Sequence, residues 1–309
     1  MKKVILFAGL LLIGTACSKS DDNSNTESTP GGGQTQVDGD KNNPTPVEEA
    51  PVYPKEKSGD DRFYGVTTYE LEGKKVKKVL KEYYSNGQKD ENNTTTTLVT
   101  YTNKKYPTLV VETRPGAVRK IEYTYNDQDK VTSMKYTANG NTEVKQLEYD
   151  EKGRVTKITL TNQSQIPITY TYTYPDDKTI VRKYSQQPNA TDTYTVEDGN
   201  LIKAVSETKN EAGEVTASYV STYEYDLAVK NPKASLEYNL VNMYFYDNIT
   251  LTERNSKNAL KKETFTGSDA GHRLQPRETS YTYQTNKDGF PVKVTERGNG
   301  YTNETVYEY

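Results

Sequence analysis

The stretch KIEYTYNDQDKVTSMKY, from Lys120 to Tyr136, decides the fold class. On both sides of its centre, apolar or aromatic residues alternate with polar ones, and β-branched and aromatic side chains predominate, as they do in strands with one buried face. The central Asn-Asp-Gln-Asp segment holds residues typical of tight turns, because their side chains bond to the neighbouring backbone. The stretch therefore predicts two antiparallel strands joined by a short turn.

The same pattern recurs along the chain: a strand ending in Tyr, an acidic or glycine-containing turn, and a strand that opens with an aliphatic residue. The copies run from Tyr123 to Val131, Tyr149 to Val155, Tyr174 to Ile180, Tyr194 to Leu201 and Tyr281 to Val292. Helical periodicity is almost absent. Residues 61–309 are therefore predicted to form one all-β domain, a long antiparallel meander of about 16–18 strands.

The composition limits how these strands can pack. Only 32% of the residues are hydrophobic, and the chain holds 27 Tyr, 5 Phe and no Trp. A two-sheet sandwich needs a thick aliphatic core that this chain lacks. We expect a twisted sheet that curls into an open or closed barrel with Tyr, Ile, Val and Leu on its inner face, because tyrosine rings pack well on cross-strand neighbours. Closure would also remove the exposed edge strands.

A membrane-spanning porin is the alternative that so many strands suggest. A transmembrane strand needs a continuously apolar outward face, and a charge facing lipid costs roughly 2–4 kcal/mol near the midplane. Here the alternate positions include Lys120, Glu122 and Thr124. The sequence therefore favours a soluble barrel that is porin-like in architecture but does not cross a membrane.

The N-terminus has the organisation of an export signal. Two lysines precede the apolar run Val4–Ile13, and the small residues Gly14–Ala16 follow it. This pattern predicts a signal peptide over residues 1–16, since the apolar run is shorter than the roughly 20 residues that a spanning helix needs. Cys17 directly after it resembles the acceptor cysteine of bacterial lipoproteins, which implies lipidation at Cys17 and an anchor in the outer membrane.

The next residues suggest where the anchored protein is displayed. Ser18-Lys19-Ser20-Asp21-Asp22 resembles the acidic tag that directs lipoproteins of the Bacteroidota to the cell surface. This resemblance implies a surface-exposed outer-membrane lipoprotein, with the periplasmic face as the alternative. The segment that follows is rich in Ser, Asp, Asn, Thr, Gly and Pro and cannot bury apolar surface. Residues 17–60 are therefore predicted to be the lipidated cysteine and a disordered polar stalk.

Charge and cysteine content narrow the classes of function. Cys17 is the only cysteine, so its acylation leaves no thiol for a disulfide, a metal site or a nucleophile. Removal of the signal peptide, which carries two lysines and no acid, changes the formal charge from −3 to −5. A mildly acidic chain is a poor partner for nucleic acid. We expect no cofactor and no metal, and the oligomeric state stays open.

Candidate catalytic residues are few. His272 is the only histidine and lies in a loop-like segment, so we interpret it as a solvated loop residue. Asp176-Asp177 fits a turn better than a calcium site, because no spaced set of oxygen ligands follows. A carboxylate pair of the glycosidase kind stays an alternative. Turn chemistry already explains the four aspartates at predicted strand ends, which are Asp150, Asp226, Asp247 and Asp288. No catalytic residue is therefore assigned.

Two family resemblances bear on the fold. Residues Tyr149–Val155, YDEKGRV, look like the YD repeat of Rhs and teneurin shells, where such repeats wind into a β-spiral. The segments Tyr223–Asn239, Glu253–Glu263 and Tyr281–Gly298 look like a Bacteroides lipoprotein family of unknown function with a porin-like fold. This second resemblance covers the whole layout of signal, linker and meander. It implies a fold but no chemistry and no catalytic residues.

Three functions follow as hypotheses. The first is a surface-tethered, non-catalytic binding module for a glycan or a protein ligand, because exposed tyrosine rings on a concave sheet can stack on sugars or contact proteins. The second is a structural or accessory component of an outer-membrane assembly, suggested by repetition without a recognisable site. The third is a carboxylate-dependent, glycoside hydrolase-like enzyme, suggested only by the number of acidic residues.

Overall fold

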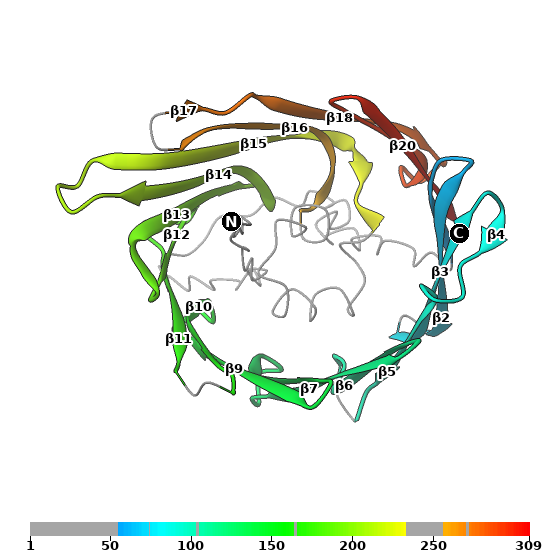
Figure 1. The fold of residues 1–309 in the computed structure, drawn as a ribbon, viewed down its shortest axis with the longest axis horizontal. Coiled ribbons are helices and arrows are strands. Elements are labelled where there is room, and N and C mark those ends of the chain that lie inside the picture. The colour runs from blue at the N-terminus through cyan, green and yellow to red at the C-terminus, as the bar shows by residue number, and fades with distance from the viewer. Residues whose placement is uncertain (1–54, 74, 103–104, 164–165, 233–255, 270–271) are drawn as a thin grey trace, which may run out of the picture. The chain divides into compact units, whose positions relative to one another are not determined.

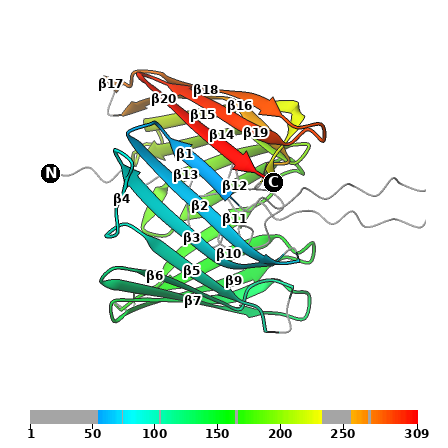
Figure 2. The ribbon, with the colours of Figure 1, turned by 90° about the vertical axis from the view of Figure 1, so that its right-hand side faces the viewer.

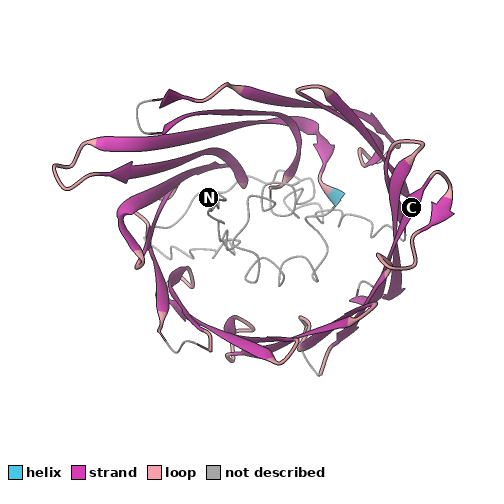
Figure 3. Cartoon of the chain, in the orientation of Figure 1, coloured by secondary structure: helices cyan, strands magenta, loops and turns pink. Residues whose placement is uncertain are grey.

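The computed structural model describes residues 55–73, 75–102, 105–163, 166–232, 256–269 and 272–309. The signal peptide, Cys17, the tag Ser18–Asp22 and Asp247 lie outside the described residues, so their predictions stay predictions. The described part belongs to one compact unit. Among the described residues no element is an α-helix, and no helix is long and apolar enough to cross a membrane. Figure 3 shows the wall as strands, with one very short helical turn.

The described residues form twenty strands, all within one sheet. In chain order the strands are β1 Lys55–Gly59, β2 Phe63–Glu72, β3 Lys75–Ser85, β4 Gln88–Lys89, β5 Thr95–Thr100, β6 Leu109–Arg114, β7 Ala117–Tyr125, β8 Val131–Ala138, β9 Asn141–Tyr149, β10 Val155–Thr161, β11 Ile168–Thr173, β12 Thr179–Tyr184, β13 Gln187–Glu197, β14 Asn200–Lys209, β15 Val215–Lys230, β16 Asn258–Asp269, β17 His272–Arg273, β18 Arg277–Thr285, β19 Pro291–Gly298 and β20 Tyr301–Glu308.

The sheet closes into a barrel (Figure 1). Every pairing is antiparallel, and β1 pairs with both β2 and β20, so the first and last strands meet. The two-residue strands β4 and β17 are side hairpins, because β3 also pairs with β5 and β16 also pairs with β18. The closed ring therefore has 18 strands. This confirms the predicted all-β antiparallel meander and decides between the open and the closed barrel that the sequence left as alternatives.

The barrel has two distinct ends, because successive turns of an antiparallel meander alternate between them. One end, which we call the clamp rim, holds turns 126–130 and 286–290, the start of β1 and the C-terminus. The other end, which we call the far rim, holds turns 139–140 and 299–300. In Figure 2 the clamp rim lies on the right, where C marks the chain end, and the far rim lies on the left beside β4 and β17.

The buried side chains lie on the inner face, since only the concave side of a closed wall can be covered by the rest of the wall. They form one cluster of aliphatic and tyrosine side chains, as the sequence predicts, whose members include Val76, Val110, Ile121, Tyr123, Met134, Val155, Ile158, Tyr172, Tyr194, Leu201 and Tyr223. The opposite face carries exposed ion pairs such as Lys157 with Glu148 and Lys120 with Glu122. The charged residues that the sequence places outward therefore do face outward.

Side-chain acceptors fix the turns at the clamp rim. Asn126 Oδ1 accepts the backbone N–H groups of Gln128 and Lys130, at 3.0 and 2.9 Å. In the next unit Asp150 Oδ1 accepts the N–H of Arg154 at 2.8 Å. Gly153 within that turn has a φ of +73°, which only glycine adopts without strain. The acidic and asparagine residues of the repeat therefore shape its turns, as predicted.

Tyrosine hydroxyls tie the repeats together at the same rim. In each case a Tyr at or near the clamp-rim end of one strand donates a hydrogen bond to a backbone carbonyl at or just before the start of the preceding strand of the ring, an arrangement that we call the tyrosine clamp. The six clamps join Tyr125 to Pro107, Tyr149 to Val131, Tyr174 to Val155, Tyr225 to Leu201, Tyr283 to Leu260 and Tyr309 to Pro291. The sequence pattern supplies part of these contacts: its Tyr149 and Tyr174 are donors, and its aliphatic residues Val131, Val155 and Leu201 are acceptors.

The domain boundary predicted at residue 61 is wrong. Strand β1 spans Lys55–Gly59, inside the range 17–60 that the sequence assigns to the stalk. It pairs along its whole length with β2 and β20 and completes the ring. The segment KEKSG contains no aliphatic or aromatic residue, so hydrophobic alternation gives no signal there. Its place in the barrel comes from backbone hydrogen bonds that close the wall.

Candidate functional site

The catalytic candidates from the sequence are scattered over the barrel. Asp150 lies in a clamp-rim turn, and Asp226 accepts the backbone N–H of Ala228 at 3.0 Å within an irregular part of β15. Asp288 lies in turn 286–290, where Asn286 rather than Asp288 supplies the turn acceptor. His272 is exposed in β17, where it pairs with Asp269. These residues do not converge on one site.

The other acidic candidates have structural roles. Asp176 accepts the backbone N–H groups of Lys178 and Thr179, at 2.8 and 2.7 Å, which lowers the pKa of its carboxyl. In the ranges that the structure describes, His, Cys, Asp and Glu side chains nowhere gather in a group of three that could hold a metal ion. We interpret Asp176 and Asp177 as turn residues, in agreement with the sequence interpretation.

The inner wall does contain charges that the sequence analysis missed. Arg182 on β12 and Asp192 on β13 face each other and are 4% and 8% exposed. Arg182 Nε and Nη2 donate to Asp192 Oδ2 at 3.1 and 2.9 Å. Arg182 and Asp192 each lie two positions from a tyrosine of the inner face, and residues two apart along a strand face the same side. This spacing is the sequence feature that predicts an inward position for both charges. Tyr194 lies beside them, and burial raises the pKa of its hydroxyl.

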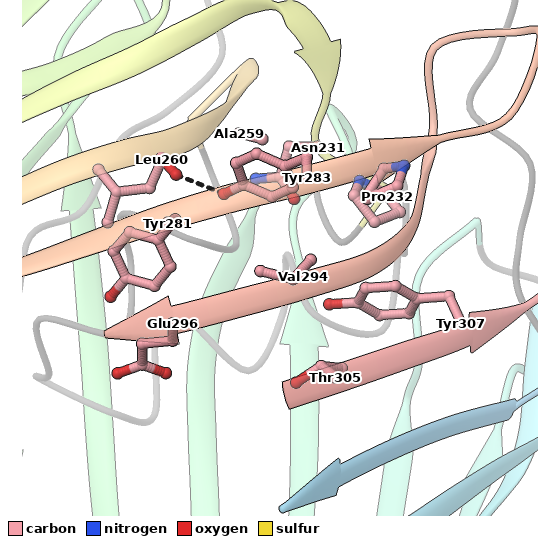
Figure 4. A pocket seen from close by; sticks show the side chains of 11 residues that line it. Asn231, Pro232, Ala259, Leu260, Tyr281, Tyr283, Val294, Glu296, Thr305 and Tyr307 are labelled. Atoms are coloured by element: carbon pink, nitrogen blue, oxygen red, sulfur yellow. Dashed lines mark hydrogen bonds between the residues drawn. The ribbon is translucent and has the colours of Figure 1, made fainter. Parts of the chain in front are cut away.

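A small pocket of about 70 Å³ lies against β18, β19 and β20 near the clamp rim (Figure 4). Tyr281, Tyr283 and Tyr307 supply its aromatic lining, and Glu296 and Thr305 supply its polar groups. Such a volume holds a few water molecules, since one water needs about 10–15 Å³ by this measure. In its present form the pocket therefore suits a small polar group and is too small for a sugar ring.

Exposed large hydrophobic side chains occur at both ends of the barrel. Leu227, which is 77% exposed, and Val306 and Tyr309, each 42% exposed, lie towards the clamp rim. Six others, which are 45–66% exposed, lie towards the far rim on strands and turns around the ring; they are Phe63, Tyr83, Val118, Ile166, Val215 and Tyr301. Three of them are aromatic and lie on β2, β3 and β20, which are separated in the ring only by β1. On the outward side of the same region the rings of Tyr64 and Tyr84 stack, with centroids 4.8 Å apart.

This aromatic gathering lies at the end of the barrel opposite Lys55, where the preceding segment joins the wall. Sequence analysis identifies the tyrosines as strand residues but does not place them at one rim, because that position depends on which strand closes the ring. No single stretch of the sequence carries this information. The far rim is therefore the surface that the structure adds to the sequence-based candidates.

Comparisons with known proteins concern the fold alone. No family model matches the chain, and no curated protein does. Among solved structures, the chain is similar to a porin-like protein from Bacteroides uniformis, with 14% identity, a TM-score of 0.43, and coverage of 84% of this chain and 98% of that one. A porin-like protein from Bacteroides vulgatus gives 14% identity, a TM-score of 0.37 and the same coverage.

The chain is also similar in structure to part of a much longer protein of another kind. A chain of the TcdB2-TccC3-Cdc42 structure matches with 16% identity and a TM-score of 0.33. The match covers 77% of this chain but only 12% of that much longer one. These likenesses carry no assignment of activity or ligand to the present protein.

Proposed function

We propose that this protein is a surface-tethered lipoprotein whose barrel acts as a non-catalytic binding or interaction module. The observation that carries the proposal is the unequal distribution of aromatic side chains, since three of the four exposed ones in the described residues lie at one end of the barrel. The chain enters the wall at Lys55 on the clamp rim, while the exposed aromatic side chains Phe63, Tyr83 and Tyr301 lie at the far rim. A lipid anchor at Cys17 would tether the barrel through its clamp rim by a flexible stalk, so that the far rim is the end of the barrel remote from the point of attachment.

The proposal is non-catalytic because the acidic side chains that the sequence offers act as turn acceptors or ion-pair partners. Exposed aromatic side chains, in contrast, supply large contact area at a low cost in side-chain entropy. The ligand class that fits such a surface is a glycan or a protein. The display at the cell surface follows from the resemblance of Ser18–Asp22 to a surface export tag.

The display is tested by protease treatment of intact cells, followed by mass spectrometry of peptides from residues 62–309. A periplasmic protein serves as the control for leakage. Release of these peptides without release of the control supports surface display. Protection of the barrel in intact cells, with cleavage after permeabilisation, would place it on the periplasmic side instead.

The binding role is tested with the mature chain from Ser18 onward, which contains the complete ring. A variant combining Phe63→Ser, Tyr83→Ser and Tyr301→Ser is compared with the unchanged chain in a screen of glycans and surface proteins. We expect the unchanged chain to bind at least one ligand and the variant to lose it. A ligand held equally well by both chains would exclude the far rim as the binding surface.

A structural or accessory role in an outer-membrane assembly is the second candidate. It is favoured by an aliphatic pair on the outward face, where Leu98, which is 51% exposed, lies opposite Val111 on β6. Such a pair on an otherwise charged wall suits a protein neighbour. Crosslinking in cells distinguishes the two roles, because an assembly component yields a defined complex and a free module yields monomers.

A further inference from the structure

Three tyrosines of the inner wall share one cross-strand arrangement. Tyr219 on β15 pairs with Gly267 on β16, Tyr301 on β20 pairs with Gly298 on β19, and Tyr83 on β3 pairs with Gly65 on β2. Each tyrosine lies across from a glycine on the neighbouring strand. We call these residues the three glycine-backed tyrosines, Tyr83, Tyr219 and Tyr301.

The glycines let the rings lie close to the sheet. A Cβ atom added at Gly298 would lie 2.2 Å from Cε1 of Tyr301, and one at Gly267 would lie 2.9 Å from Cδ1 of Tyr219. At Gly65 the corresponding distance to Cε1 of Tyr83 is 3.5 Å. At Gly298 and Gly267 a side chain would therefore displace the facing ring, whereas at Gly65 the distance is an ordinary van der Waals contact. The Tyr219 ring also stacks on Phe265, with centroids 6.2 Å apart. Tyr301 and Tyr83 remain 48% and 45% exposed.

Register places all three rings on one face near the far rim. Thr305 and Tyr307 of β20 line the inner pocket, and residues two apart along a strand face the same side, so Tyr301 faces inward as well. Thr305 pairs with Ser58 and Ser58 pairs with Gly65, which carries the inner face across β1 to β2. Tyr83 opposite Gly65 is therefore also on the inner wall.

Polar groups lie between the rings. The Tyr301 hydroxyl donates to Glu296 Oε1 at 2.7 Å, and this hydrogen bond raises the pKa of Tyr301. Asn303 Nδ2 and Thr305 Oγ1 donate hydrogen bonds to Ser58 Oγ at 3.3 and 3.0 Å. Carboxylate, amide and hydroxyl groups thus alternate with flat aromatic faces along the wall.

We propose that this wall binds a neutral oligosaccharide, with the three glycine-backed tyrosines as stacking platforms. Sugars present an apolar ring face and a rim of hydroxyls, which matches an aromatic face flanked by acceptors and donors. A lipid or an apolar peptide would meet too many polar groups between the rings. Acidic sugars are disfavoured because Glu296 beside Tyr301 would repel them.

The spacing of the platforms points to a chain of several sugars. Tyr301 and Tyr83 are three strands apart in the ring, and Tyr219 lies four strands from Tyr301 in the other direction. With neighbouring strands about 4.8 Å apart, the first separation is about 14 Å and the second about 19 Å. A monosaccharide contacts only one platform, whereas an extended oligosaccharide reaches two or three.

The inference rests on the proposed binding function and names its ligand class. The test uses the mature chain and isothermal titration with neutral hexasaccharides of glucose, mannose and xylose, together with oligogalacturonate as the acidic probe. We expect at least one neutral hexasaccharide to bind and oligogalacturonate not to bind. Tyr301→Ala and Tyr219→Ala should each raise the Kd about tenfold.

Two further variants separate stacking from folding. Tyr301→Phe keeps the ring and should leave the Kd within about threefold, while Tyr64→Ala removes a tyrosine of the outward face and should leave it unchanged. Thermal unfolding of each variant checks that the barrel is intact. Wild-type affinity in Tyr301→Ala, or no binding of any neutral hexasaccharide, overturns the inference. If protease treatment still releases the barrel and a protein ligand still needs the far rim, the proposed function survives that result.

Discussion

Loss of Arg182 from the inner wall should destabilise the barrel strongly. The side chain is 4% exposed and donates two hydrogen bonds to Asp192 Oδ2, which is itself buried. Arg182→Met leaves that carboxylate in a low-dielectric site without its counter-charge. Removing one partner of a buried ion pair costs about 3–5 kcal/mol. In a domain of this size, each kcal/mol lowers Tm by about 2–4 °C, so we expect a fall of about 6–20 °C.

The assay is urea unfolding and calorimetry of the mature chain, with a double variant as the decisive comparison. Arg182→Met combined with Asp192→Leu removes both charges and should recover most of the lost stability, because the penalty comes from the charge left unpaired. Lys157→Met is the matched control, since its pair with Glu148 has side chains 40% and 60% exposed. Exposed pairs contribute about 0–1 kcal/mol.

Two outcomes would refute this reasoning. If Arg182→Met changed the free energy of unfolding by no more than Lys157→Met does, the pair would not be buried in the folded protein. If the double variant were as unstable as the single one, the loss would come from the packing of the arginine stem and not from an unpaired charge. The first result would contradict the inward position of this pair in the barrel wall. The second would contradict only the electrostatic explanation of the lost stability.

Two further predictions concern the repeat at the clamp rim. Tyr149→Phe removes the hydroxyl that donates to the Val131 carbonyl at 2.6 Å and should cost about 0.5–1.5 kcal/mol in urea unfolding, whereas Tyr64→Phe should change nothing measurable. Hydrogen bonds from Arg154 outweigh the effect of burial and lower the pKa of Asp150, so its stabilisation is present above about pH 4 and is lost as pH falls through the folded value. Asp150→Asn should therefore flatten part of the acid-induced fall in Tm, and an unchanged pH profile would contradict this assignment.

Much of the fold was predictable because it is written locally and repeatedly. The alternation in Lys120–Tyr136 predicts strands β7 and β8, and the turn residues between them form the hydrogen bonds expected of Asn126. The expectation of about 16–18 strands agrees with the ring because each hairpin carries its own turn signal. Closure was left open by the sequence, since it depends on a pairing between β1 and β20 that no local pattern encodes.

The candidate sites were much less predictable. Asp150 and Asp288 were correctly interpreted as turn residues, because turn chemistry acts over a few neighbouring positions. The far-rim aromatics and the three glycine-backed tyrosines depend instead on cross-strand register. Gly298 and Tyr301 are close in sequence, but Tyr219 and Gly267 meet only because β15 pairs with β16. A sequence pattern identifies each strand and does not fix which residues of two distant strands face each other.

The tyrosine hydrogen bonds are concentrated at one end of the barrel, and this uneven distribution connects the stability of the barrel with its proposed function. All six tyrosine clamps act at the clamp rim, where the polar segment before β1 also joins the wall. At the far rim, by contrast, strands β13 and β15 begin with exposed residues, among them Val215, which is 49% exposed. Local opening is easiest where few side chains are buried, and binding elements are drawn from such regions. If the proposed tether and ligand are correct, the barrel is fastened by the clamps at the end nearer the tether, and its far rim adjusts to the ligand while the ring stays closed.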